Sequence, residues 1–214
     1  MKTAKIILMA LTCVSLQSYS NLSAAEGEQQ IQAPEMVRIP GRNYEIGKYE
    51  VTQAQWRAVV GDHPLKFSNC GDNCPVEQVS WRDAHNFIDK LNSMTGKQYR
   101  LPIGDEWEYA CYGGKKTKYC GGNNVVAVAW ESTDSGGHAH PVGQKQPNSY
   151  GVYDMSGNVD EWTEDCVAGD CALRILRGGA WDDAPQFIHA DFLDRFISEG
   201  RDMGHGFRLV RTLP

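Results

Sequence analysis

The chain has 214 residues, a formal net charge of −6 and 41% hydrophobic residues. This length is typical of one domain with a substantial core. The acidic charge, with no basic run, argues against nucleic acid as a partner, and no segment is both long and apolar enough for a transmembrane helix.

Residues 1–25 have the features of a secretory signal peptide. Lys2 and Lys5 precede a short apolar run, and Ser23-Ala24-Ala25 supplies the small residues of a cleavage site. We therefore predict a mature N-terminus at Glu26 and export to the periplasm or the medium. The polar residues 26–35 are predicted to form a flexible arm, and 36–214 the folded domain.

Without Cys13 of the signal peptide, six cysteines remain, and each near pair brackets a turn-rich segment. In an exported protein such cysteines are typically disulfide-bonded. None has the C-x-x-C spacing of many zinc sites, so metal binding is the less favoured alternative. Six cysteines allow fifteen connectivities. We predict the local pairs Cys70–Cys74, Cys111–Cys120 and Cys166–Cys171.

The first predicted elements are a hairpin and a helix. Met36–Ile39 and Tyr44–Tyr49 alternate like short strands around a turn-forming segment. Thr52, with Gln55 three residues later, forms a capping box that starts a helix. Gly61 is predicted to end it.

A second helix is predicted to begin at Ser80, with Asp83 completing the capping box, and to end before Gly96. Tyr99–Leu101 then reads as an extended piece and Asp105–Tyr112 as a short third helix. The second helix has one apolar face at three- and four-residue steps, made of Trp81, Ala84, Ile88 and Leu91.

Regular structure is predicted to fade over Gly113–Asn158, interrupted only by Val125–Trp130. Closing strands are expected at Leu173–Leu176 and Phe207–Arg211. The aromatic content argues against a disordered linker. Five tryptophans are predicted to be core residues: Trp56, Trp81, Trp107, Trp162 and Trp181.

The order of short motifs along the chain is more specific than any one motif. The motifs are Tyr49–Trp56, Pro75–Trp81, Tyr99–Pro102, Glu106–Ala110, Pro147–Met155, Ser156–Trp162, Leu176–Trp181 and Gly206–Val210. In this order they resemble the formylglycine-generating enzyme/sulfatase-modifying factor family, over about Met36 to Arg211. The resemblance implies a C-type-lectin-like α+β fold with few helices, short twisted strands and long ordered loops.

The enzymes of this family use copper, held by two cysteines that follow the R-G-G-S-[WY] motif, to oxidise a sulfatase cysteine to formylglycine. Aligned on Arg177–Trp181, these two positions fall at about Ile188 and Leu193. Neither side chain can ligate copper, because Cu(I) prefers soft sulfur ligands. Copper is therefore not expected, and neither is formylglycine oxidase activity.

A calcium site of the family is matched better. The resemblance carries its ligands over to the side chains of Asp154 and Glu161 and the backbone carbonyls of Gly157 and Val159. Hard oxygen ligands at a glycine-containing turn suit Ca²⁺. The alternative is that the polar residues of this turn only cap and solvate it.

Two further sets of residues have a functional and a structural interpretation. His138 and His140 could form a metal pair, but a Gly-rich surface loop is favoured. Near the former copper positions, a different metal or acid/base site could be built from Asp182, Asp183, His189, Asp191 and His205, with Asp194 nearby. Scattered surface acids are the simpler interpretation.

The favoured hypothesis is an exported, calcium-stabilised binding or accessory module. It would bind an unknown protein or small-molecule ligand through the surface of residues 182–205. The alternative is an oxidoreductase or protein-modifying enzyme of the same family that uses a non-cysteine site. Convergence of at least two of the candidate side chains in a cleft would favour the enzyme.

Overall fold

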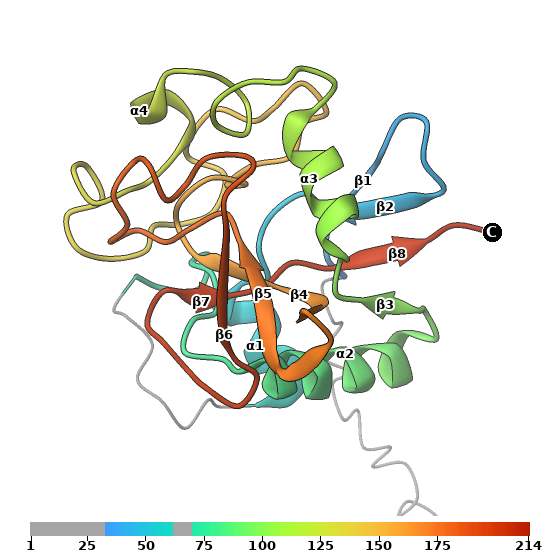
Figure 1. Ribbon diagram of the computed structural model, residues 1–214. Coiled ribbons are helices and arrows are strands. Elements are labelled where there is room, and N and C mark those ends of the chain that lie inside the picture. Colours follow the sequence, from blue (N-terminus) through green and yellow to red (C-terminus); the bar gives the residue numbers. More distant parts are fainter. Residues whose placement is uncertain (1–32, 62–69) are drawn as a thin grey trace, which may run out of the picture. The chain divides into compact units, whose positions relative to one another are not determined.

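Two four-stranded sheets form the framework of the computed structural model, which describes residues 33–61 and 70–214 (Figure 1). The first sheet has the order β1-β2-β8-β3, and every neighbouring pair in it is antiparallel. The C-terminal strand therefore lies inside this sheet, between two strands from the first half of the chain. The strands are β1 (Met36–Arg38), β2 (Tyr44–Gly47), β8 (Val210–Thr212) and β3 (Tyr99–Arg100).

The second sheet has the order β6-β5-β4-β7, so β6 lies at a sheet edge. Strand β4 pairs antiparallel with β5 and parallel with β7, where Asp160 lies opposite His205. This pairing brings two titratable residues that are 45 positions apart in the sequence onto neighbouring strands. The strands are β4 (Asp160–Val167), β5 (Asp170–Arg177), β6 (Leu193–Ile197) and β7 (His205–Gly206).

Both predicted capping boxes are confirmed. Helix α1 (Gln53–Val60) begins after Thr52, and α2 (Trp81–Thr95) begins after Ser80 and ends at Gly96, which has the left-handed conformation. The third helix, α3 (Gly104–Tyr112), starts one residue earlier than predicted, and Glu106 accepts a hydrogen bond from the Ile103 N–H group. The fourth, α4 (Val125–Val128), is a single turn within the loop-rich region.

Helices α1 and α2 pack through aromatic side chains. The rings of Trp56 and Phe87 stack with centroids 5.6 Å apart, and Phe207 meets Phe87 edge-on at 5.4 Å. Such ring pairs add roughly 0.5–1.5 kcal/mol to the burial of their apolar area. This cluster therefore ties the N-terminal helices to the segment that leads into β8.

The tryptophan prediction is only partly correct. Trp56, Trp107 and Trp162 are buried in the core, but Trp81 and Trp181 are half-buried. The Arg174 guanidinium lies over the Trp81 ring, 3.8 Å from its centroid. Because the charged guanidinium itself stays near solvent, the ring face beneath it is not buried in the apolar core. The helical spacing of Trp81 does not reveal this contact.

The loops between α3 and β4 are held by close backbone contacts. Gly157 has φ +74°, and a Cβ atom placed on it would lie 2.0 Å from the carbonyl oxygen of Trp130. A side chain is therefore excluded at this position on two grounds, the backbone conformation and the contact. The short polar loop of His138 and His140 is also ordered, because the His140 ring stacks on Trp130 with centroids 3.7 Å apart.

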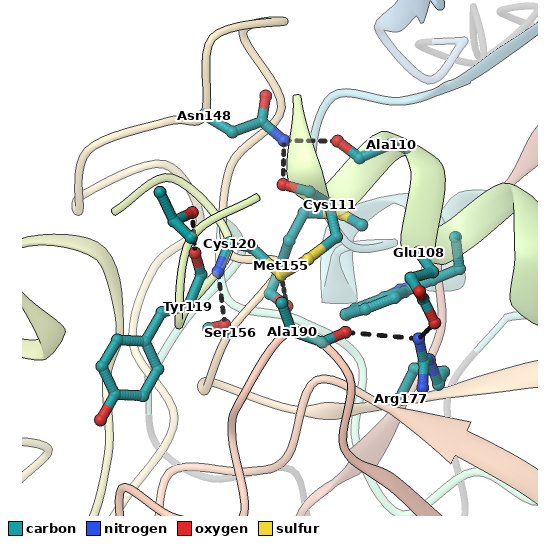
Figure 2. Close-up of a disulfide and its surroundings, with 12 residues drawn as sticks. Glu108, Ala110, Cys111, Tyr119, Cys120, Asn148, Met155, Ser156, Arg177 and Ala190 are labelled. Carbon is teal, nitrogen blue, oxygen red and sulfur yellow. Dashed lines mark hydrogen bonds and ion pairs between the residues drawn. A yellow bond between two sulfur atoms is a disulfide. The ribbon is translucent and has the colours of Figure 1, made fainter. Parts of the chain in front are cut away.

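All three predicted disulfides are present. Figure 2 shows the Cys111–Cys120 bridge, which joins the end of α3 to the loop that follows it. The Cys120 N–H group donates to Ser156 Oγ, and the Asn148 side chain donates to the carbonyls of Ala110 and Cys111. This bridge thus connects α3 to the long loops of the second half of the chain.

The α+β class predicted from the sequence is confirmed by these elements. The predicted signal peptide, residues 1–25, and most of the predicted arm, residues 26–35, lie outside the described residues. No helix within the described part of the chain is long and apolar enough to cross a membrane.

Candidate functional site

A buried ion pair lies where β4 meets the segment between β7 and β8. Glu161 and Arg208 are both completely buried, and two Arg208 nitrogens donate to the two Glu161 carboxylate oxygens at 2.6 Å. The Trp107 indole N–H donates to the same carboxylate at 2.7 Å. Arg208 also donates to three backbone carbonyls, those of Gly47, Tyr153 and Asp154. The pair therefore joins both sheets and α3.

Two further buried carboxyl groups lie beside this pair. Burial raises the pKa of Glu50 well above its ordinary value, and the neighbouring charges of Asp154 and Glu161 act in the same direction. Burial also raises the pKa of Asp154 to about 6. Glu50 accepts hydrogen bonds from the Asn158 side chain and the Val159 N–H group. Three carboxyl groups thus face one arginine, which leaves an excess of negative charge when all are ionised.

The proposed calcium ligands lie around this cluster. Asp154 has φ +55° and accepts a hydrogen bond from the Gly143 N–H group through one carboxylate oxygen. Glu161 Oε1 accepts one hydrogen bond, from Arg208, and therefore keeps one lone pair. The calcium prediction from the sequence adds the carbonyls of Gly157 and Val159 to these carboxylates, and such oxygens are the ligand type that a hard cation prefers. A dication would also offset the excess negative charge.

The two positions that correspond to the family's copper ligands lie in different surroundings. Ile188 is completely buried and packs with Tyr119, Val128 and Ala129. Leu193 begins the edge strand β6 and is 52% exposed. All six cysteines of the described residues are in disulfides, so none of them offers a thiolate.

Asp182 acts electrostatically on both Asp183 and His205, so three of the five candidates for an alternative site share one charged neighbourhood. His205 on β7 lies within the electrostatic fields of Asp182 and of two further residues, Asp194 and Asp202. Asp183 lies within the fields of the same three aspartates, and its own charge acts on the buried Asp160. We call this group the acidic cluster: Asp160, Asp182, Asp183, Asp194 and Asp202, around His205.

Burial controls the protonation of this cluster. It raises the pKa of Asp160 well above its ordinary value, an effect that the charge of Asp183 reinforces. Burial also lowers the pKa of His205, against the opposing fields of the neighbouring aspartates. The Asp160 carboxylate accepts a hydrogen bond from Gly179 N–H at 2.8 Å, and that of Asp183 accepts one from Ala180 N–H at 2.8 Å. The R-G-G-x-W turn thus supports two members of the cluster.

The other two candidates do not join this group. His189 is half-buried, and its ring meets Tyr119 edge-on at 5.3 Å. Asp191 is exposed, and its field acts on Tyr112 of α3. Sequence reasoning missed Asp160 and Asp202 because the parallel pairing of β4 and β7 that assembles the cluster leaves no local pattern. No group of three or more His, Cys, Asp or Glu side chains within the described ranges is arranged to hold a metal ion.

The segment of residues 182–205 exposes several large apolar side chains among its charged ones. The described residues expose seven large apolar side chains, and four of them lie in this segment. Exposed apolar side chains that gather in one region are typical of interaction surfaces. The four are Phe187, Leu193, Ile197 and Met203, which are 42–57% exposed.

Comparison with known families identifies the fold. The family model described as "Sulfatase-modifying factor enzyme 1-like domain" matches residues 14–213. The chain belongs to this family. The resemblance drawn from the motifs is therefore confirmed, and with it the fold of the sulfatase-modifying factor family.

Members of the sulfatase-modifying factor family with different names are similar to the chain. A protein named "Chaperone protein LppX" from Paenibacillus barcinonensis is 32% identical over 79% of this chain and 80% of its own length. "Inactive C-alpha-formylglycine-generating enzyme 2" from Bos taurus is 38% identical over 51% of this chain, but over only 39% of its own length. Among solved structures, Treponema denticola variable protein 1 matches with a TM-score of 0.71 and 26% identity, over 83% of this chain and 91% of its own.

Proposed function

We propose that this protein is an exported accessory module that binds a partner through residues 182–205 and does not make formylglycine. The observation that carries the proposal is the absence of sulfur at the two aligned copper positions, Ile188 and Leu193. Cu(I) in proteins depends on soft thiolate or thioether ligands. The disulfides support location in an oxidising compartment, either the periplasm or the medium.

Two kinds of observation support a binding role. The surface of residues 182–205 exposes four large apolar side chains on the loops and edge strand that follow the R-G-G-x-W motif. Relatives include one protein named as a chaperone and one named as inactive, so the family contains members that are not named for formylglycine formation. A scaffold that keeps its core while its loops change can acquire a new ligand.

Calcium is proposed as a structural ion at the turn from Asp154 to Glu161. The support is the set of hard oxygen donors described above, together with the buried excess of negative charge around Arg208. The ion would hold the loop before β4 in place and would have no part in a reaction.

The test is direct. Purified protein is supplied with copper and oxygen, incubated with a peptide that carries a sulfatase cysteine, and the peptide is analysed by mass spectrometry. We expect unchanged cysteine, and metal analysis without stoichiometric copper or iron. An established formylglycine-generating enzyme serves as the positive control. Formylglycine on the peptide would overturn the proposal.

One observation favours a second candidate, an oxidoreductase or protein-modifying enzyme with a non-cysteine site. Asp182 acts electrostatically on Asp183 and on His205, and charged neighbours that shift one another's pKa are one feature of an acid/base site. The two candidates differ in their metal content, because stoichiometric copper or iron in purified protein would favour the enzyme. Calcium alone would favour the binding module.

A further inference from the structure

One face of strands β5 and β6 lies outside the core, at the edge of the second sheet (Figure 1). Leu176 and Phe196 point the other way, toward the buried cluster that contains Trp162. Side chains alternate along a strand and paired residues share a face, so the residues between them form an outer face. Its apolar members neither belong to the buried clusters of the described residues nor pack on them. They are Leu173, Ile175, Leu193 and Ile197, of which the last two are 52% and 55% exposed.

The backbone of β6 has hydrogen-bonding groups that point away from the sheet. The Ser198 N–H group donates to the Ala172 carbonyl at 2.8 Å. Residues that are hydrogen-bonded to the neighbouring strand alternate along an antiparallel ladder. The N–H and carbonyl groups of Leu193, Arg195 and Ile197 therefore point outward, away from β5.

Most of these outward groups are unused. The Arg195 N–H group donates to Asp194 Oδ1, and the Ile197 carbonyl accepts from the Gly200 N–H group. The others have no hydrogen-bond partner in the described part of the chain: the Leu193 N–H and carbonyl, the Arg195 carbonyl and the Ile197 N–H. A row of unpaired N–H and carbonyl groups at a sheet edge is a template for one more strand. The backbone thus indicates an extended segment as the ligand.

Arg195 supplies the charge of the outer face. It lies between Leu193 and Ile197, is exposed and forms no ion pair among the described residues. Arg177, on the same face, is already bound to Glu108 at 2.6 Å. Opposite charges that face each other on neighbouring strands attract. The free cation therefore favours an added strand with an acidic residue at this position.

A second copy of the chain does not fit this edge. If two β6 strands paired antiparallel over their full length, Arg195 of one copy would lie opposite Arg195 of the other. Like charges directly opposite each other are destabilising. The edge therefore suits a different chain.

We propose that β6 accepts an extended strand of a protein partner, with an acidic side chain opposite Arg195 and apolar side chains opposite Leu193 and Ile197. This inference rests on the proposed binding function and names the chemistry of its partner. Main-chain hydrogen bonds would supply affinity, and the alternate side chains would supply selectivity. The apolar side chains of the added strand would cover Leu193 and Ile197.

The probe is a short fluorescein-labelled peptide in which valine, glutamate and valine alternate with threonine. Its binding to the full mature chain is measured by fluorescence anisotropy. Leu193→Ser/Ile197→Ser is the test variant. Met94→Ser/Val126→Ser is the matched control, because these side chains are 51% and 54% exposed on α2 and α4. Equal melting temperatures of the two variants establish that both are folded.

We expect the Kd of the peptide to rise roughly tenfold in the test variant, because two apolar contacts are lost, and less than twofold in the control. Arg195→Glu should raise the Kd roughly fivefold, and a peptide with lysine in place of the glutamate should restore binding to this variant.

Peptides with N-methylated amides test strand addition on the unchanged protein. In an added strand only every second residue directs its N–H group toward β6. Methylation of one alternate set of amides should therefore abolish binding, whereas methylation of the other set should leave it intact.

Absence of binding to the wild-type chain, equal weakening in both double variants, or equal effects of the two methylated sets would overturn the inference. So would a dimer of the chain that Leu193→Ser/Ile197→Ser disrupts, because a second copy would then occupy the edge. Each of these results is independent of the formylglycine assay, which alone decides the proposed absence of oxidase activity.

Discussion

Glu161 and Arg208 link several buried parts of the fold. Each is completely buried, and their pair receives or donates hydrogen bonds to α3, to both sheets and to the loop before β4. A buried pair adds little net stability over an apolar replacement, but the loss of one partner leaves an uncompensated charge.

Arg208→Met should therefore lower the free energy of unfolding by about 3–5 kcal/mol, because the Glu161 carboxylate would be left buried without its partner. Chemical denaturation measures this change. Arg195→Met is the matched control, because Arg195 is exposed and forms no ion pair among the described residues. Equal effects of the two substitutions would contradict the role given to the buried pair.

His205 should make stability depend on pH. Its pKa is lower in the folded protein than the 6.5 of an unfolded chain, so the unfolded state binds more protons between the two values. Stability should therefore fall as the pH decreases from about 6.5 toward the folded pKa. The pKa values of Asp160 and Asp183 are raised in the folded protein, so the contribution of these two residues to stability decreases as the pH rises. The free energy of unfolding of wild type and of His205→Gln is measured across this pH range, and the difference between them gives the contribution of the histidine. A difference that does not vary with pH would refute the prediction.

Calcium should stabilise the folded protein if Asp154 is a ligand. An ion present at 100 times its Kd adds about 2.7 kcal/mol to the free energy of unfolding, so chelation should lower the melting temperature. Asp154→Asn should abolish the response to calcium, whereas Asp89→Asn, an exposed change on α2, should keep it. Glu161→Ala is a poorer probe, because it also breaks the pair with Arg208. A melting temperature that chelation leaves unchanged would remove calcium from the proposal.

At the scale of elements, helices α1, α2 and α3 were predictable, whereas strands β4, β6 and β7 were not. The capping boxes of α1 and α2 are local patterns of four residues, so they can be recognised without the rest of the chain. Strand β4 was not predicted: its first residues belong to the predicted calcium turn, and the strand is rich in polar residues. Glu161 is buried in the strand because Arg208, 47 residues later, neutralises it. Strand β6 is short, and its pairing with β5 leaves no local signal either.

The contribution of the N-terminal cap of α2 to stability can be measured with one substitution. Ser80 is buried, and its hydroxyl accepts a hydrogen bond from the Asp83 N–H group at 3.1 Å. Ser80→Ala should cost about 1 kcal/mol of stability, because this donor would lose its partner. Ser93→Ala, on the exposed side of the same helix, should change stability by only a few tenths of a kcal/mol. Thermal unfolding of both variants checks the difference, and equal stability would mean that the cap is not important.

For the whole molecule, the motif order predicted the family and the cysteine spacing predicted the bridges, because both are properties of the linear sequence. The acidic cluster could not be predicted from the sequence. Its members come from four separate segments, and the candidate set of Asp182, Asp183, His189, Asp191 and His205 contained only three of its six residues. His189 and Asp191 were predicted because they lie close in sequence to the other candidates. Asp160 lies near His205 because β4 pairs with β7, and the sequence alone does not show this pairing.

The disulfides and the predicted export signal lead to one prediction about the mature protein. Peptide mapping without reduction should find no free thiol, because all six cysteines of the described residues are bridged. N-terminal sequencing of the exported protein should begin at Glu26. Several free thiols, or a mature chain that keeps residues 1–25, would contradict the assignment to an oxidising compartment.

The position of β8 has a consequence for biosynthesis. Because this strand fills the space between β2 and β3, the first sheet stays incomplete until residues 210–212 have been made. Up to that moment β2 pairs only with β1, and β3 has no partner in the sheet. The first sheet should therefore close only after synthesis has reached residues 210–212, whatever the order in which the earlier elements form.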